Sequence, residues 1–526
     1  MTTTKNILIF IFFALLQGYS FIIKGQQPND WIKELDLPGI TVTSVEQIPA
    51  GDYTPPGQKN TYKGLPAFVR VELVSRPTPQ SYIRIEVWLP QNRWNERFMG
   101  SGNGGGGGRF NYDALAGCLK DNYAVTNSDM GTSPHVDSLV NKPERWADFG
   151  HRATHEMTVV AKAVVEKYYQ RPPLYSYFSG CSTGGQQALM SAQRYPNDYD
   201  GILVGAPANN RTHLHAMFLW NCVVTNEKPE NLFTRQQVDY ITRTVLKNNV
   251  GKDGGYSGDN FLTDPSLATL DLDKLDSLTQ EQKNILKKIY TGPLNPVTGE
   301  HIYTPIPMGS ESANAGLFEQ QDKRWSDYNF YPFRWVFGLG FDPMKFDFNK
   351  DMARVDSVLA PLINANNPDL KPFQSSGGKL LMYSGAADPL VPYQDAVNYY
   401  ERVVADQGSI ESTQNFFRFF IVPGMWHCNG GPGACNIGQY ITDLSKPSEY
   451  CIFTALVQWV EKGIVPEQII ATAHKKNGGI LFQTPVYPYP QFPNHIKGKK
   501  HRTPSSYRGT QHEGGNVIVP APKYLR

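Results

Sequence analysis

The chain has 526 residues, of which 40% are hydrophobic and 12% aromatic, with 50 Lys and Arg against 48 Asp and Glu. This length suits two or three domains, and the hydrophobic share is enough for a large buried core. The balance of charge does not favour nucleic-acid binding, which requires a concentrated basic surface, so we expect no nucleic-acid partner.

The first 25 residues are typical of an export signal. Lys5 precedes an apolar run at 7–16, and small and polar residues follow it as far as Gln27. The run is shorter than the roughly 20 apolar residues that a membrane span needs, and no later stretch is long enough either. We therefore predict a signal peptide at 1–25, no membrane span, and a mature protein that is secreted or periplasmic. A buried first helix is the alternative.

Strands and helices then alternate along the chain. Alternating apolar and polar residues predict half-buried strands at 67–73 and 82–89. Short apolar runs predict further strands at 123–126, 175–179 and 202–204. Apolar residues at three- and four-residue spacing predict helices at 149–169 and 186–195. This alternation favours a mostly parallel sheet with helices on both faces.

The pattern changes after Pro207. Residues 207–375 are rich in Asn, Asp, Gly and aromatic residues and lack regular alternation. Strands and helices resume with predicted strands at 379–383 and 416–422 and predicted helices at 393–404 and 450–462. We predict an α/β core formed by residues 26–206 and 376–490, interrupted by a large insertion at 207–375. Residues 491–526 are expected to form a C-terminal tail that lies on the surface or is partly disordered.

The segment Gly180-Cys181-Ser182-Thr183-Gly184 is a G-x-S-x-G sequence between a predicted strand and a predicted helix. This is the context of a nucleophile elbow, a turn so tight that glycines must flank the serine, whose hydroxyl is then presented at the end of the sheet. The helix that begins there also brings the positive end of its dipole near developing negative charge. The motif predicts Ser182 as a nucleophile; an ordinary turn is the alternative.

A serine nucleophile needs a base, and the base needs an orienting acid. In α/β-hydrolases the acid and then the histidine follow the serine along the chain. Asp388 comes directly after the predicted strand at 379–383, and His427 follows the one at 416–422, so both would lie at the edge of the sheet where ligands bind. We predict a triad of Ser182, Asp388 and His427. The alternatives are a turn or cap for Asp388 and a structural role for His427.

The glycine run at 104–108 follows an early strand. A phosphate-binding loop would continue with Lys-Ser or Lys-Thr, which is not present. We expect an oxyanion loop, because side chains would obstruct the approach of backbone N–H groups to the substrate. The predicted donors are the backbone amides of Gly105 and Thr183, with a neighbouring glycine of the run as the alternative to Gly105.

His151 and His155 lie four residues apart on a predicted helix, but Arg152 stands where a zinc-protease motif has its glutamate. We expect no metal there and no cofactor in the chemistry.

These features resemble the tannase and feruloyl esterase family of α/β-hydrolases, which also contains hydrolases of terephthalate monoesters. The matching segments keep the family's order over residues 60–500; they are 98–105, 152–155 with Lys162, 177–206 including the G-x-S-x-G motif, 377–392, and Met425-Trp426-His427-Cys428. The resemblance implies an α/β-hydrolase core, a lid domain at 207–375 that selects the substrate, and a serine esterase that acts through an acyl-enzyme.

The resemblance also implies a disulfide between Cys181 and Cys428, which would tie the serine loop to the histidine loop. Two unpaired thiols are the alternative. The pairing of the remaining cysteines stays open; they are Cys118, Cys222, Cys435 and Cys451. Family members often bind calcium in the lid, but this lid has fewer carboxylates, with Asp253 and Asp259 as the expected ligands. A structural calcium therefore stays an open alternative.

The substrate that the resemblance implies is a small aromatic ester or a feruloylated oligosaccharide of plant cell-wall material. Gallate esters, as in a tannase, and terephthalate monoesters are alternatives, as are a peptidase of the same fold and a non-catalytic surface protein that binds phenolics or glycans. Aromatic residues of the lid could line a slot for the ring or form the lid's own core; they are Trp325, Tyr328, Phe330, Tyr331, Phe333, Trp335 and Phe337. The sequence indicates no oligomeric state.

Overall fold

The computed structural model describes residues 31–32, 35, 37–499, 502–511, 514–515 and 517–521. The predicted signal peptide, residues 1–25, lies outside the described residues. Within them, no helix combines the length and the apolar character that crossing a membrane requires.

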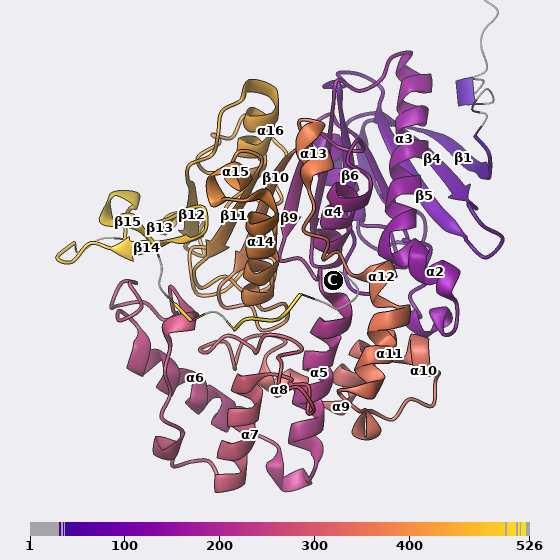
Figure 1. The fold of residues 1–526 in the computed structure, drawn as a ribbon. Helices are drawn as coiled ribbons and strands as arrows, with labels where there is room; N and C mark the ends of the chain where they lie inside the picture. Colours follow the sequence, from indigo (N-terminus) through magenta and orange to yellow (C-terminus); the bar gives the residue numbers. More distant parts are fainter. Residues whose placement is uncertain are drawn as a thin grey trace, which may run out of the picture.

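In the part of the chain that the structure describes, nine strands form one central sheet in the order β1-β4-β5-β7-β6-β8-β9-β10-β11 (Figure 1). The first three pair antiparallel; they are β1 (Ile40–Ile48), β4 (Phe68–Ser75) and β5 (Ile83–Pro90). The other six run parallel to one another; they are β7 (Ala124–Ser128), β6 (Arg97–Ser101), β8 (Tyr175–Cys181), β9 (Gly201–Gly205), β10 (Lys379–Gly385) and β11 (Phe417–Val422). The predicted α/β class with a mostly parallel sheet is confirmed.

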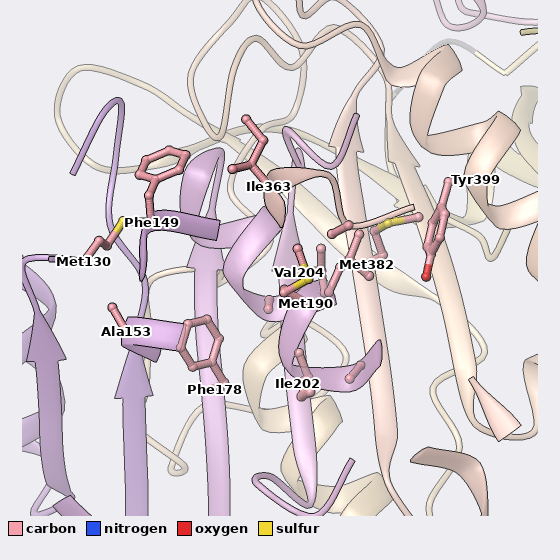
Figure 2. Packing of buried hydrophobic residues seen from close by; sticks show 14 of the residues in the cluster. Met130, Phe149, Ala153, Phe178, Met190, Ile202, Val204, Ile363, Met382 and Tyr399 are labelled. Atoms are coloured by element: carbon pink, nitrogen blue, oxygen red, sulfur yellow. The ribbon is translucent and has the colours of Figure 1, made fainter. Parts of the chain in front are cut away.

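Helices cover both faces of this sheet, and a separate apolar cluster fills the space on each face. One cluster joins the sheet to α3 (Ala153–Tyr169), α4 (Thr183–Arg194) and α14 (Tyr393–Gln407), and the other joins it to α1 (Tyr112–Lys120) and α16 (Ile452–Lys462). Figure 2 shows part of the first cluster, in which Met190 of α4 packs with Ile202 and Val204 of β9. Each such side chain contributes about 1.5–3 kcal/mol when it is fully buried.

Strand β5, which its alternating sequence predicted to be half-buried, is buried on both faces except at Arg84. In β5, Ile83, Ile85, Val87 and Leu89 contribute to the first cluster, whereas Trp88 contributes to the second. The predicted helix at 149–169 does not begin as an α-helix, because residues Asp148–Arg152 form a π-helical turn before α3. Strands β1 and β6 were missing from the expected elements.

The insertion at 207–375 consists mainly of helices, most of which lie below the sheet in Figure 1. They are α5 (Arg211–Asn226), α6 (Arg235–Asn249), α7 (Gln280–Thr291), α8 (Leu317–Gln320), α9 (Lys323–Asn329), α10 (Tyr331–Phe337), α11 (Lys350–Val358), α12 (Ala360–Ile363) and α13 (Lys371–Ser375). Helices α5, α6 and α7 share an apolar cluster that includes Leu214, Val245 and Ile285, whereas buried residues of α10 to α13 join the cluster on the α3 side of the sheet. Both α6 and α7 begin with a capping box, formed by Thr234 with Gln237 and by Thr279 with Gln282.

Short elements complete the described chain: β2 (Gly51–Tyr53), β3 (Tyr62–Leu65), α2 (Pro143–Ala147), α15 (Ile410–Gln414), β12 (Ile469–His474), β13 (Ile480–Val486), β14 (Gln491–His495) and β15 (Tyr507–Gln511). The segment expected to be a surface tail, 491–526, thus includes β14 and β15, which pair antiparallel. The preceding segment is attached to the edge of the main sheet, because the N–H of Tyr489 donates to the carbonyl of Phe419 in β11.

Candidate active site

Ser182 lies in the turn between β8 and α4 with a left-handed backbone conformation, φ 64° and ψ −119°. Such a conformation costs a non-glycine residue about 1–3 kcal/mol and persists only where the surroundings impose it. Here the surroundings are other backbones in direct contact. A Cβ atom on Gly180 would lie 2.6 Å from the carbonyl carbon of Gly184, and one on Gly102 would lie 2.5 Å from the Cα of Gly184. The turn therefore requires glycine at 180 and 102, and it is tight at Gly184, where a Cβ atom would lie 3.1 Å from the Cα of Gly102.

The backbone of Ser182 is held to the sheet, because its N–H donates to the carbonyl of Gly205 over 3.0 Å. The residue is thus fixed at the carboxyl end of β8. There it lines a cavity of about 840 Å³ that His427 also lines. The structure places the predicted nucleophile and the predicted base around one space.

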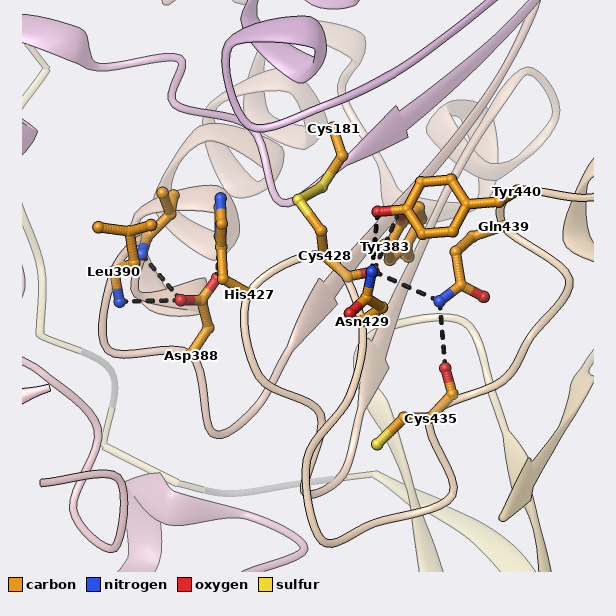
Figure 3. The surroundings of a disulfide bond; sticks show 11 residues. Cys181, Tyr383, Asp388, Leu390, His427, Cys428, Asn429, Cys435, Gln439 and Tyr440 are labelled. Carbon is orange, nitrogen blue, oxygen red and sulfur yellow. Dashed lines mark hydrogen bonds and ion pairs between the residues drawn. A yellow bond between two sulfur atoms is a disulfide. The ribbon is translucent and has the colours of Figure 1, made fainter. Parts of the chain in front are cut away.

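Asp388 and His427 are in contact at this edge of the sheet (Figure 3). The Nδ1 atom of His427 lies 2.7 Å from Oδ2 of Asp388, which is fully buried. The other carboxylate oxygen accepts the N–H groups of Leu390, at 2.8 Å, and of Val391, at 3.0 Å. Because an ionised carboxylate only accepts hydrogen bonds, Nδ1 carries the proton and Nε2 presents a lone pair.

This Nε2 atom is buried and has no hydrogen-bond partner among the described residues. A buried imidazole nitrogen that is left free to accept a proton is what a general base requires. No hydrogen bond joins it to Ser182 in the described structure, and catalytic hydrogen bonds of this kind often tighten only in the substrate complex.

A disulfide joins Cys181 to Cys428, residues that are 247 positions apart, with 6.0 Å between their Cα atoms (Figure 3). This predicted pair is confirmed. The bridge links the residue before Ser182 to the residue after His427. The remaining thiols of the described chain are free and buried; they are Cys118, Cys222, Cys435 and Cys451.

Contacts to its backbone also fix the histidine loop. Cys428 has a φ of 64°, and its carbonyl accepts hydrogen bonds from the Tyr383 hydroxyl, at 3.5 Å, and from Nε2 of Gln439, at 3.3 Å. A Cβ atom on Gly385, at the end of β10, would lie 2.3 Å from the carbonyl oxygen of Met425. The acid loop and the histidine loop are therefore packed backbone against backbone.

Thr183 and Gly105 meet beside the nucleophile. Thr183 is the first residue of α4, so its N–H has no partner within the helix. Its hydroxyl donates to the carbonyl of Gly105 over 2.6 Å. The N–H groups of Gly102 and Asn103 are already bonded, to Ser179 and Gln187.

Gly104 and Gly105 follow Asn103 and line the cavity. Their N–H groups have no hydrogen-bond partner within the described residues. Gly104 is therefore a candidate oxyanion donor that the sequence did not single out.

Arg211, at the start of α5, is a cavity-lining residue that the sequence did not indicate. It is 4% exposed, and its guanidinium donates to Gln186, to the Tyr331 hydroxyl at 3.0 Å and to the Thr183 hydroxyl at 2.6 Å. Among the described residues, no carboxylate forms an ion pair or hydrogen bond with it. Through Thr183 it therefore supports the loop that carries Gly105.

Part of the lid's aromatic run takes the cavity-lining role that the sequence left open, and the rest packs against the sheet rather than forming a core of the lid's own. Trp325, Tyr328 and Tyr331 line the cavity. Phe330, Phe333 and Trp335 are buried in the apolar cluster on the α3 side of the sheet. His215 and Phe218 of α5 also line the cavity.

Asp253 and Asp259 do not form a calcium cage. The carboxylate of Asp253 accepts the N–H groups of Gly255, Thr263 and Asp264. Asp259 is paired with Arg502, whose Nη1 lies 2.5 Å from its Oδ1. Since calcium needs six to eight oxygen ligands, these residues do not fit the ion.

The described residues hold no group of three or more His, Cys, Asp or Glu side chains that could bind a metal. His151 and His155 instead contact Tyr195, at 2.7 Å, and Asp198, at 2.9 Å.

The family model described as "Tannase and feruloyl esterase" matches residues 69–509 of this chain. An uncharacterized esterase of Xanthomonas campestris is 32% identical over 514 residues, which cover 87% of this chain and 86% of that protein. A probable feruloyl esterase B-2 of Aspergillus oryzae is 31% identical over 464 residues, covering 83% and 86%. The crystal structure of feruloyl esterase B from Aspergillus oryzae aligns with a TM-score of 0.84 at 25% identity, covering 91% of this chain and 99% of that one.

Proposed function

This chain belongs to the tannase and feruloyl esterase family and is a carboxylic ester hydrolase, and from that premise we propose that it cleaves feruloyl-type aromatic esters through an acyl-enzyme on Ser182. One observation carries the proposal. Nδ1 of His427 is bound to buried Asp388, while Nε2 is buried at the cavity that Ser182 lines and has no hydrogen-bond partner in the described part of the chain.

In the proposed reaction, Nε2 of His427 removes the proton of the Ser182 hydroxyl as the oxygen attacks the ester carbonyl. The negative charge that develops on the carbonyl oxygen is stabilised by the backbone N–H groups of Thr183 and Gly105. The tetrahedral intermediate expels the alcohol, which takes the proton from His427. Asp388 keeps the imidazole in the required tautomer and stabilises its charged form.

Water then hydrolyses the acyl-enzyme by the same steps. His427 removes a proton from the water as it attacks the acyl carbonyl, and returns that proton to the Ser182 oxygen. The products are a free carboxylic acid and an alcohol. None of these steps uses a cofactor.

The residues that line the cavity support the proposal that the acyl group is aromatic. The cavity volume of about 840 Å³ is within the range for small-molecule sites. Trp325, Tyr328, Tyr331 and Phe218 can pack against a ring. We propose esters of plant cell-wall phenolics, either small or attached to an oligosaccharide, as the substrates. Gallate esters and terephthalate monoesters are the alternatives.

We further propose that the protein is exported. The Cys181–Cys428 disulfide supports this, because disulfides persist in oxidising compartments and are rare in the cytosol. N-terminal sequencing of the protein recovered outside the cytoplasm should begin near residue 26.

The test of the function is labelling with a fluorophosphonate, mapped by mass spectrometry, together with a panel of hydroxycinnamate, gallate and terephthalate methyl esters. We expect the label on Ser182 and hydrolysis of at least one aromatic ester. A label on another serine would refute the assignment of the nucleophile. No label and no hydrolysis would favour the non-catalytic binding protein.

A further inference from the structure

His215 of α5 occupies an unusual place in the lid wall of the cavity. It lines the cavity, yet the residue is only 2% exposed. Its Nδ1 atom lies 2.5 Å from the backbone carbonyl oxygen of Asn329. The ring is also held edge-on by Tyr331, at 4.9 Å between ring centroids, and by Phe218, at 5.4 Å. These contacts fix the orientation of the imidazole.

The contact with Asn329 determines which nitrogen carries the proton. A carbonyl oxygen can only accept a hydrogen bond, so Nδ1 must donate. Burial and the neighbouring Arg211 guanidinium lower the pKa of His215 to about 3, which keeps the ring neutral. A neutral imidazole with a proton on Nδ1 has a lone pair on Nε2. His215 therefore presents a hydrogen-bond acceptor.

That acceptor is not satisfied by the protein. Nε2 of His215 is buried and has no partner within the described residues. The nearby Arg211 guanidinium already donates to Gln186, Tyr331 and Thr183. A buried acceptor without a donor is unfavourable, and native proteins rarely leave one unless a ligand or water supplies the hydrogen.

We propose that His215 selects aromatic acyl groups that carry a ring hydroxyl, with that hydroxyl donating a hydrogen bond to Nε2. This inference rests on the proposed function and refines it. A phenolic hydroxyl is a donor, so hydroxycinnamates and gallates satisfy the acceptor. The carboxylate of a terephthalate monoester only accepts, so its oxygen would face the lone pair of Nε2 without a hydrogen between them.

The first experiment needs only the wild-type protein and matched esters. Methyl ferulate and methyl isoferulate each carry one hydroxyl at a different ring position, and methyl 3,4-dimethoxycinnamate carries none. We expect kcat/KM for one or both hydroxylated esters to exceed that for the dimethoxy ester by about 10- to 100-fold, because a site built around a hydroxyl discriminates strongly against its absence. Monomethyl terephthalate should be as poor as the dimethoxy ester. Equal rates on all of these esters would overturn the inference.

The second experiment removes the acceptor while keeping a ring. His215→Phe should lower kcat/KM for the preferred hydroxylated ester by about 10- to 100-fold and change that for the dimethoxy ester by less than about threefold. His474→Phe, at an exposed histidine of β12, is the matched control and should keep the wild-type preference. A preference that survives in His215→Phe would assign the selection to another residue.

If His215→Phe fails to fold, binding to the Ser182→Ala variant replaces it. The preferred hydroxylated ester and the dimethoxy ester should bind to this variant without being hydrolysed, so their dissociation constants report recognition alone. The hydroxylated ester should bind about 10-fold or more tightly than the dimethoxy ester, and equal binding would contradict the role of His215.

Failure of the inference can be told from failure of the proposed function. Methyl cinnamate has no ring substituent, and its hydrolysis together with fluorophosphonate labelling tests the esterase itself. Hydrolysis of methyl cinnamate without a preference for hydroxylated rings would remove only the role of His215. The absence of both hydrolysis and labelling would remove the proposed function as well.

Discussion

The two sides of the cavity are built by different means. On the sheet side, the loops that carry Ser182, Asp388 and His427 are fixed by contacts between backbones, by glycines that admit no side chain and by a disulfide. On the lid side, the wall is formed by side chains such as His215 and Tyr331, positioned by single hydrogen bonds and ring contacts. A change on the sheet side should abolish the reaction, whereas a change on the lid side should alter which ester reacts.

The largest expected effect is that of removing the nucleophile. Ser182→Ala should lower kcat on methyl cinnamate by about 10⁴-fold or more, since substrate binding and the oxyanion site give only a small residual rate. Ser357→Ala, at an exposed serine of α11, should behave as the wild type. Retention of more than a tenth of the activity in Ser182→Ala would place the chemistry on another residue.

The next largest effect should follow from changing the acid. Asp388→Asn replaces an acceptor with an amide that can turn its NH₂ group toward the imidazole and favour the wrong tautomer of His427. We expect kcat to fall by about 10³- to 10⁴-fold with the melting temperature little changed. The rate of fluorophosphonate labelling should fall in parallel, and labelling at the wild-type rate would show that Asp388 does not orient the base.

A smaller effect should follow from opening the disulfide. The double variant Cys181→Ala/Cys428→Ala should lose about 2–4 kcal/mol of stability and should be less active, because the serine and histidine loops are no longer tied together. Dithiothreitol should lower the melting temperature of the wild type and leave that of the double variant unchanged. A wild-type melting temperature that does not change with the reductant would show that the disulfide contributes little to stability.

Arg211 belongs to the lid but supports a loop on the sheet side through Thr183, so Arg211→Met should weaken the support of the oxyanion loop and lower the rate. The Thr183 hydroxyl, and through it the Gly105 carbonyl, would lose the guanidinium contact, and we expect kcat on methyl cinnamate to fall by about 10-fold with a smaller change in KM. This ester lacks a hydroxyl, so the measurement does not depend on His215. Arg243→Met, at an exposed arginine of α6, is the control. A change in KM alone would assign Arg211 to substrate binding.

The smallest effect concerns the pair formed by Asp259 and Arg502, which we propose takes the place of a lid calcium. Neither EGTA nor added calcium should shift the melting temperature of the wild type. Arg502→Ala should lower it by about 1–3 °C at pH 8, and Arg508→Ala, at an exposed arginine of β15, should not. A melting temperature that rises by several degrees with calcium would contradict the proposal.

The pH dependence of this variant gives a second check. Burial raises the pKa of Asp259 to about 6 from its ordinary value of 3.8, although Arg502 opposes the rise. A raised pKa means that the folded protein favours the neutral carboxyl, so this group stabilises the fold less as the pH rises from about 4 to above about 6. Arg502 offsets that loss by pairing with the ionised form. Its removal should therefore matter more at about pH 8 than at about pH 5.

On the sheet side of the cavity, the positions of the candidate residues could be predicted from the sequence, because the local geometry there restricts the choice of residue. Glycines around Ser182 mark the elbow, and the position of Asp388 directly after a strand marks its place at the edge of the sheet. The pairing of Cys181 with Cys428, by contrast, came from resemblance, since spacing alone allows many pairings.

The lid side could not be predicted in the same way. The roles of His215 and Arg211 depend on tertiary contacts with Asn329 and Thr183 that leave no pattern in the chain. The pair of Asp259 with Arg502 joins residues 243 positions apart. The helices α6 and α7 could have been found, since their capping boxes are visible in the sequence, whereas α5 is buried on most sides and shows no amphipathic stripe.

The bridge from Cys181 to Cys428 makes one covalent ring of every residue between them, the lid included. A protease that cuts the lid once would open this ring without releasing a fragment, so both halves of the active site would remain in one molecule. The lid can therefore acquire nicks, or accept insertions over the course of evolution, while the serine and the histidine stay chemically linked.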